Sequence, residues 1–317
     1  MFIIPKKVKW FQGFIIMDVF CNDCPRQCGA KRDSDRPAGI CCSPALPRVA
    51  RAAPHFGEEP CISGTKGSGT VFFTGCNLRC VFCQNREISR GQGGELLTVS
   101  QLRDVMLRLR DQGVHNINLV TGAHFVRPIA QALEGLDLDI PVVWNSSGYE
   151  SVESLRRLEG LVQVYLPDFK YWKSDLARRY SLAEDYPGVA AAAIKEMFRQ
   201  TGPYELDEEG LLRRGVLIRH LILPGQDLNA MDVIDFAAEE FPEGSVLFSL
   251  MSQYTPMPGL ERFPELLGRV DAETNQRLIA YMEKRGLSGY WQEPDAATDE
   301  MIPAFDGTGL NPARASE

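Results

Sequence analysis

Short runs of β-branched and apolar residues alternate with longer amphipathic stretches between residues 69 and 250. Strands that alternate with helices form parallel sheets, because the chain must return to the same end of the sheet before each new strand begins. The pattern therefore predicts an α/β fold. Six runs are the predicted strands: Val71–Phe73, Ile117–Val120, Val142–Trp144, Val162–Phe169, Val216–Leu223 and Val246–Leu250.

Two helices between these strands have the clearest signals. Val99–Gln112 places its apolar side chains at helical spacing on one face, with Thr98 as a candidate N-cap and Gly113 as a stop signal. Met231–Phe241 is followed by Pro242, which cannot continue a helix.

The composition excludes several classes of protein. Of the 317 residues, 44% are hydrophobic and 24% are charged, which is typical of a globular chain that needs no disulfides to fold. A net charge of −8 argues against binding to nucleic acid or to an anionic membrane. No stretch of 18 apolar residues predicts a transmembrane helix.

The N-terminus does not have the pattern of a signal peptide. Its apolar run, Phe14–Ile16, is short, and no small-residue cleavage site follows it. Met17 is an alternative start to Met1. Unpaired thiols are typical of a reducing compartment, so we expect a cytoplasmic protein.

Nine cysteines lie in the first 83 residues and none follows Cys83. Because nine is odd, they cannot all form disulfides. A chain of this length does not need them for stability, so they indicate chemistry in the N-terminal third.

Cys76, Cys80 and Cys83 lie on a loop directly after the first predicted strand. A four-iron cluster normally takes four thiolates, so three would leave one iron open to another ligand. Structural zinc is the alternative, but it usually closes with four ligands. Three thiols that only pack in the core are the third alternative.

The spacing Cys76-x-x-x-Cys80-x-x-Cys83, with Phe82 before the last cysteine, resembles the signature of the radical S-adenosylmethionine (SAM) enzymes. The resemblance implies a [4Fe-4S] cluster on these cysteines, with SAM on the open iron. It implies reductive cleavage of SAM to methionine and a 5′-deoxyadenosyl radical, which abstracts hydrogen from a substrate. It also implies a partial (β/α)6 TIM-like barrel, whose functional residues gather at the C-terminal ends of the strands.

The strand ends supply further candidates. Gly122 follows the second strand, where the family binds the SAM amino group, and Asn145 ends the third in a turn that resembles the activating-enzyme branch. Strand alternation puts Asp168 and Lys170 on one face, and the same branch has an Asp-x-Lys near SAM. On the fifth strand Arg219 and His220 must point oppositely. Arg219 suits the SAM carboxylate, because a guanidinium binds a carboxylate through two nitrogens.

A second cysteine set lies nearer the N-terminus and comprises Cys21, Cys24, Cys28 and Cys41. Its spacing fits either a structural zinc or an auxiliary iron–sulfur cluster. Cys42 and Cys61 have no assigned role. His55, Glu58 and Glu59 lie between the two cysteine sets, where we expect an exposed acidic turn.

We therefore expect three regions: a small N-terminal Cys-rich extension (1–60), a radical SAM partial barrel (61–290) and a C-terminal tail (291–317). The stretch Glu59–Phe73 and the N-terminal cysteines resemble an uncharacterised subgroup related to pyruvate formate-lyase activating enzyme. That resemblance implies flavodoxin or ferredoxin as reductant and a glycyl radical enzyme as protein substrate. The alternatives are a radical SAM enzyme acting on a small molecule or peptide, and a non-catalytic metal-binding or electron-transfer protein.

Overall fold

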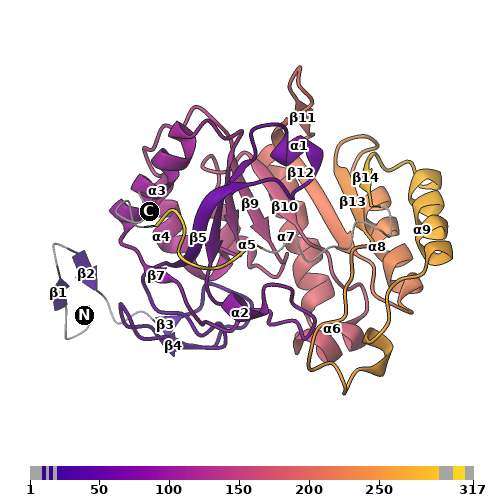
Figure 1. The fold of residues 1–317 in the computed structure, drawn as a ribbon, viewed down its shortest axis with the longest axis horizontal. Helices are drawn as coiled ribbons and strands as arrows, with labels where there is room; N and C mark the ends of the chain where they lie inside the picture. The colour runs from indigo at the N-terminus through magenta and orange to yellow at the C-terminus, as the bar shows by residue number, and fades with distance from the viewer. Residues whose placement is uncertain (1–8, 12–13, 17–19, 293–302, 311–317) are drawn as a thin grey trace, which may run out of the picture.

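The computed structural model describes residues 9–11, 14–16, 20–292 and 303–310, and its centre is one curved sheet (Figure 1). Along the sheet the strands follow the order β14-β13-β12-β10-β9-β8-β6-β5-β7. Every neighbouring pair from β6 to β14 is parallel. The parallel strands are β6 (Ser68–Phe73), β8 (Ile117–Val120), β9 (Val142–Ser146), β10 (Val164–Pro167), β12 (Leu212–Leu221), β13 (Leu247–Met251) and β14 (Gly289–Trp291).

Three further strands are antiparallel to their neighbours. β5 (Arg48–His55) pairs with β6 on one side and with β7 (Glu95–Leu96) on the other, and β11 (Glu205–Leu206) pairs with β12. The described strands form an open path that does not close on itself. The molecule is therefore a mixed α/β protein with a partial barrel.

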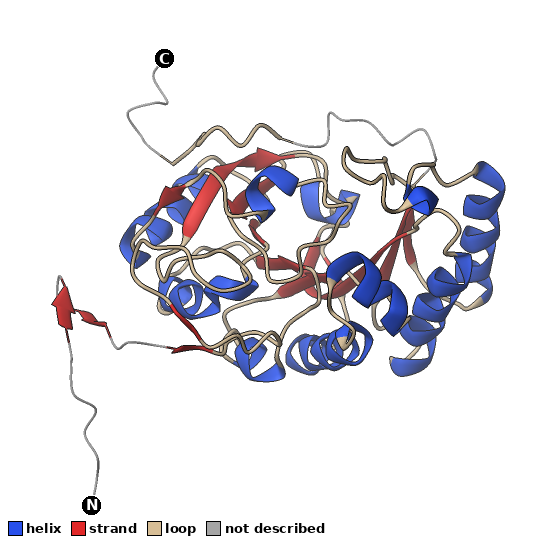
Figure 2. Cartoon of the chain, turned by 90° about the horizontal axis from the view of Figure 1, so that it is seen from below, coloured by secondary structure: helices blue, strands red, loops and turns tan. Residues whose placement is uncertain are grey.

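Helices cover the outer side of this sheet (Figure 2). Between sheet and helices lies the main apolar core, and a second cluster on the inner side includes Val143, Val164 and Leu217. Burial on both faces explains why the strands are almost continuously apolar. The helices are α3 (Val99–Asp111), α4 (Val126–Leu133), α5 (Val152–Arg156), α6 (Ser174–Ser181), α7 (Tyr186–Thr201), α8 (Asp227–Glu240) and α9 (Ala272–Lys284), with short turns α1 (Pro60–Ser63), α2 (Arg86–Ser89), η1 (Ala123–Phe125) and η2 (Pro264–Leu266).

The sequence predicted these elements well where apolar residues recur at a regular spacing. The strand Ile117–Val120 is confirmed at both ends, and α3 begins after Thr98 with a capping box. The Thr98 hydroxyl accepts from the Gln101 amide at 3.2 Å, and the Gln101 side chain accepts from the Thr98 amide at 2.8 Å. β5 was not predicted, because arginine and proline interrupt its pattern.

Two segments lie outside the parallel sheet. In the N-terminal segment, β1 (Lys9–Phe11) pairs with β2 (Phe14–Ile16), and β3 (Phe20–Cys21) pairs with β4 (Ala30–Lys31). Residues 303–310 run along the free edge of β5, where Ala52 N donates to Thr308 O at 2.9 Å. Both candidate start methionines, Met1 and Met17, lie outside the described residues. None of the described helices is long and apolar enough to span a membrane.

Candidate active site

A loop from Thr74 to Gln84, called here the cluster loop, carries the three predicted ligand cysteines between β6 and α2. It turns sharply at Gly75, whose φ of 92° lies in the left-handed region that favours glycine. A Cβ at Gly75 would lie 2.2 Å from the Ser43 hydroxyl, so only glycine fits against the N-terminal segment here. As expected, the cluster loop begins at the C-terminal end of β6.

The three cysteines of the cluster loop are free thiols that lie close together. Burial raises the pKa of Cys76, and burial and the neighbouring thiols raise the pKa of Cys83 to about 12. Two polar groups donate to these sulfurs: Ser181 Oγ to Cys80 Sγ at 3.1 Å, and Leu78 N to Cys76 Sγ at 3.4 Å. Because bound iron carries positive charge, it would favour the thiolates that burial disfavours.

These residues fit an iron–sulfur cluster better than a single ion. Within the described ranges, no three His, Cys, Asp or Glu side chains converge as ligands of one metal ion. A four-iron cluster binds each thiolate through a different iron, so its ligands are held further apart. Three free thiols, with donors to two of them, match a cluster that keeps one iron open.

Phe82, the aromatic residue before the last cysteine, anchors the cluster loop to the rest of the fold. Its ring makes edge contacts with Tyr171, Tyr180 and Tyr254 at centroid distances of 6.1 to 6.3 Å. These rings come from three separate parts of the chain, so the aromatic residue fixes the loop by packing.

Inside the barrel, charged and amide side chains form what we call the inner polar layer. Arg219 lies at its centre and contacts two of the predicted residues: its Nε donates to Asp168 Oδ1 at 2.9 Å, and its Nη2 to Asn145 Oδ1 at 2.6 Å. Lys170 Nζ donates to Asp168 Oδ2 at 2.6 Å. The layer comprises Glu58, Glu59, Asn118, Asn145, Asp168, Lys170, Arg219 and Ser249.

The buried charges of Asp168 and Lys170 hold each other ionised. Burial opposes ionisation of Asp168, but Arg219 and Lys170 outweigh it and lower the pKa of its carboxyl. Burial likewise opposes the charge of Lys170, and Asp168 and the Cys80 thiol outweigh it and raise its pKa. The Lys170 charge opposes, by a smaller amount, the burial that raises the pKa of Cys76 and Cys83, so it lies within electrostatic range of the cluster loop.

His220 lies on the opposite face of β12, as the alternation predicts. It is buried, and its Nδ1 lies 2.6 Å from the Phe169 carbonyl oxygen. Burial lowers its pKa to about 4, so it is a neutral core residue at pH 7.

The expectation of an exposed acidic turn at Glu58 and Glu59 is wrong. Their side chains are 9% and 8% exposed and point into the barrel. Glu58 Oε2 accepts from Arg219 Nη1 at 2.8 Å, while its Oε1 accepts from the side-chain amides of Asn145 and Asn118 at 2.9 and 3.1 Å. The pattern Glu-Glu-Pro has the composition of a surface turn, and no periodic signal distinguishes it from one.

The segment with these glutamates enters from the N-terminal ends of the strands. It leads into α1, which Figure 1 shows at the end of the sheet opposite α2 and the cluster loop. Cys61 and Ile62 of α1 pack against Val143, Val164 and Leu217 on the inner side of the sheet. α1 therefore plugs the barrel and holds the two carboxylates above the plug.

Gly122 lies apart from the inner polar layer. A Cβ there would lie 2.8 Å from Ile129 and 3.0 Å from the Trp144 ring, so packing accounts for a glycine at this position. Its predicted contact with SAM stays a prediction, as do the SAM contacts of Asn145, Asp168, Lys170 and Arg219.

The N-terminal cysteines gather beside the cluster loop. Cys21, Cys24 and Cys41 are buried, and Cys41 raises the pKa of both Cys21 and Cys24 after the larger effect of burial. Cys28 is exposed, but a Cβ on Gly39 would lie 3.0 Å from its sulfur and 3.9 Å from that of Cys41. The four cysteines thus lie in one segment, although no three of them converge as ligands of a single ion in the described part of the chain, and their metal stays a prediction.

Arg26 ties the N-terminal segment to the cluster loop. Its Nε donates to the Asn77 carbonyl at 2.9 Å, and its Nη2 donates to the carbonyls of Leu78 at 3.3 Å and Ser181 at 2.8 Å. From the other side, Arg79 Nη1 donates to the Ile40 carbonyl at 3.3 Å. The N-terminal segment is therefore hydrogen-bonded to the cluster loop at Asn77, Leu78 and Arg79, between Cys76 and Cys80.

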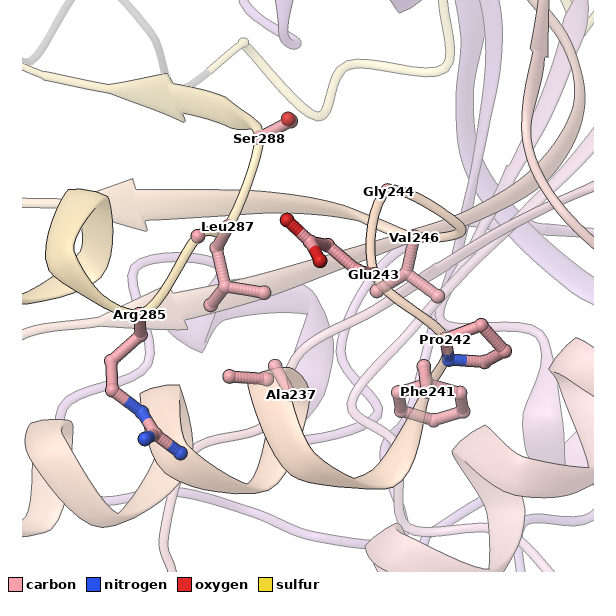
Figure 3. A pocket seen from close by; sticks show the side chains of 11 residues that line it. Ala237, Phe241, Pro242, Glu243, Gly244, Val246, Arg285, Leu287 and Ser288 are labelled. Carbon is pink, nitrogen blue, oxygen red and sulfur yellow. The ribbon is translucent and has the colours of Figure 1, made fainter.

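A recess of about 120 Å³ lies away from these residues, between α8 and the loop before β14 (Figure 3). It is lined by residues that precede β13 and β14, including Glu243, Val246, Arg285 and Leu287. It is therefore at the opposite end of the strands from the cluster loop and is not the candidate active site.

Comparisons with known proteins agree with this arrangement. The family model of the radical SAM superfamily matches residues 70–237, more than half of the chain. An uncharacterized protein of Methanocaldococcus jannaschii is 29% identical over 282 residues, which is 84% of this chain and 75% of that protein.

Two solved structures are distant in sequence. Streptococcus suis SuiB bound to S-adenosylmethionine is 13% identical, with a TM-score of 0.49 over 73% of this chain, which spans about half (51%) of SuiB. A domain of pyruvate-formate lyase-activating enzyme from Bacteroides vulgatus is 14% identical, with a TM-score of 0.35 over 61% of this chain and 91% of that domain.

Proposed function

Because the chain belongs to the radical SAM superfamily, we propose that it uses Cys76, Cys80 and Cys83 to hold a [4Fe-4S] cluster and cleaves SAM reductively. When bound, the cluster supplies the electron that splits SAM into methionine and a hydrogen-abstracting 5′-deoxyadenosyl radical. The observation that carries the proposal is the group of three free, mutually interacting thiols on the loop after β6, within electrostatic range of Lys170.

The inner polar layer is proposed to orient SAM. Arg219 is the group for its carboxylate, because a guanidinium offers paired donors and this one is already held in place by Asp168 and Asn145. Asn145 would bond the ribose or the carboxylate, and Gly122 would receive the amino group. Asp168 and Lys170 would set the charge around the cofactor.

The proposed substrate is a glycine of a partner enzyme, which loses hydrogen to become a glycyl radical. Support comes from the resemblance of Glu59–Phe73, of the N-terminal cysteines and of the Asp168-x-Lys170 pair to activating enzymes. A flavodoxin or ferredoxin would supply the electron. Nucleic acid is not a proposed partner, since the chain carries a net charge of −8.

The first test is SAM cleavage by anaerobically reconstituted protein. With dithionite and SAM, cluster-loaded protein should release 5′-deoxyadenosine, and a fully loaded sample without product would contradict the proposal. Co-incubation with candidate glycyl radical enzymes, read by electron paramagnetic resonance, then tests the target. A glycyl radical signal supports activation, whereas SAM cleavage without that signal for any candidate favours a small-molecule or peptide substrate.

We also propose that Cys21, Cys24, Cys28 and Cys41 bind a second metal centre, either zinc or an iron–sulfur cluster. Elemental analysis of the purified protein should then find zinc, or iron beyond the four atoms of the first cluster. A Cys24→Ser/Cys41→Ser variant should lose that metal, and its first cluster should be lost faster in air because Arg26 would no longer be held against Asn77.

The matched control for this experiment is Cys42→Ser. Cys42 adjoins the set but is partly exposed. Equal metal content in both variants and in the wild-type protein would contradict a second centre.

A further inference from the structure

The charges of the inner polar layer do not balance. Three carboxylates, Glu58, Glu59 and Asp168, face the cations Arg219 and Lys170. Asp168 contacts both cations, and Glu58 contacts Arg219 at 2.8 Å. Glu59 is left 4.0 Å from Arg219 Nη1, the nitrogen that already serves Glu58. The layer therefore has one carboxyl group more than it has cations.

Two hydrogen-bond acceptors at the bottom of the layer lack donors. Glu59 Oε2 and Asn118 Oδ1 are both buried, and neither has a partner among the described residues, although the Ser249 hydroxyl lies near the Glu59 carboxyl. Asn118 is fully buried, and its amide nitrogen donates to Glu58, so its free oxygen belongs to the same hydrogen-bonded layer. Buried polar atoms are normally satisfied, so two free acceptors together indicate a donor that binds there.

Side-chain exposure decreases towards these acceptors. It is 18% for Lys170 and 17% for Asp168, near the cluster loop, then 12% for Arg219 and 8% for Glu59. In the strand register, Val120 lies beside Asn145, so Asn118 is two residues closer to the N-terminal ends of the strands. The layer is thus more exposed at Lys170 and Asp168 than at Glu59 and Asn118.

The missing donor has the chemistry of an organic cation. Asp168 lies at Nε of the Arg219 guanidinium and the two glutamates lie at Nη1, and no three carboxylates of the described residues converge on one ion, which disfavours a metal ion. A protonated amine or a guanidinium offers both a positive charge and several N–H donors. Burial raises the pKa of Glu59, so the carboxyl favours a proton until such a cation replaces it.

We propose that Glu59 and Asn118, supported by Glu58, bind a cationic nitrogen group, a primary ammonium or a guanidinium, of the molecule that loses hydrogen. This inference rests on the proposed function, because it assumes a substrate inside the barrel. Both glutamates precede residue 70, where the family match begins, so family membership alone does not assign them.

The test compares two peptides that differ only in the cation. The probes are acetyl-glycyl-lysine amide and acetyl-glycyl-norleucine amide, and their dissociation constants are measured by equilibrium binding to cluster-loaded protein with SAM and no reductant. Wild-type protein should bind the lysine peptide at least about ten-fold more tightly, the size expected of a charge-assisted hydrogen bond. Glu59→Gln should reduce that preference to less than about three-fold, since an amide cannot neutralise the ammonium.

Matched variants keep this test decisive. Glu208→Gln, in the exposed turn after β11, should retain the full preference. Asn118→Ala, which removes the other free acceptor, should also weaken binding of the lysine peptide. This variant takes the place of Glu59→Gln in the test if Glu59→Gln does not fold. Equal binding of both peptides to wild-type protein, or a full preference in both site variants, would overturn the inference.

Failure of this inference can be told from failure of the proposed function. SAM cleavage without any peptide preference would remove only the cation site. A peptide preference without 5′-deoxyadenosine release from loaded protein would instead remove the proposed reaction.

Discussion

Replacing Cys76, Cys80 and Cys83 together with alanine should remove about four irons per chain from anaerobically reconstituted protein. The three side chains are the free thiols of the cluster loop, and each would bind a different iron. Release of 5′-deoxyadenosine should fall to background, because no other described group would bind the cluster in the open-iron arrangement. Iron analysis and the visible absorption of the cluster measure the first effect, and product chromatography measures the second.

The control for this variant is Cys61→Ala. Cys61 is also a buried free thiol, but it lies in α1 at the other end of the barrel. It should keep the full iron content and the full rate of SAM cleavage. Retention of the cluster in the triple variant would refute the assignment of the site.

Arg219→Ala should weaken SAM binding by about ten- to one-hundred-fold while the iron content stays unchanged. The guanidinium is the proposed partner of the SAM carboxylate, and it is not a cluster ligand. Its removal also leaves Glu58 without its ion pair and Asp168 with Lys170 as its remaining partner, so the free energy of unfolding should fall by about 3–5 kcal/mol. SAM titration of the loaded protein and thermal unfolding measure these two effects separately.

Two further variants separate charge from geometry. Arg213→Ala removes an exposed arginine of the same strand, which faces Asp207 at 4.0 Å, and should change neither quantity appreciably. Arg219→Lys keeps the charge but loses the fork that reaches Asp168, Asn145 and Glu58 at once, so its affinity for SAM should be intermediate. An unchanged affinity in Arg219→Ala would exclude this residue from the SAM site.

The α/β class and the cluster loop were predictable because their signals are local. Repeating apolar positions predicted β8 and α3 almost to the residue. The alternation of a strand placed Asp168 and Lys170 on one face and separated Arg219 from His220. The three-cysteine spacing lies within eight residues, so it needed no knowledge of the fold. The predicted bounds of the fifth strand, Val216–Leu223, differ from those of β12, Leu212–Leu221. Pairing with β11 extends β12 at its N-terminal end, beyond the apolar run that predicted it.

The sequence by itself determined the fold class, the loop that carries the three cysteines and the opposite orientations of Arg219 and His220, because these follow from patterns over a few residues. Only the tertiary structure decided that Glu58 and Glu59 lie inside the barrel. Their partners Asn118, Asn145 and Arg219 are 60 to 161 residues away, and no short pattern records such a contact. The same holds for the N-terminal cysteines, whose position beside the cluster loop depends on hydrogen bonds from Arg26 to a loop 51 residues away. Burial of a charge depends on distant partners that neutralise it, and folding alone brings those partners together.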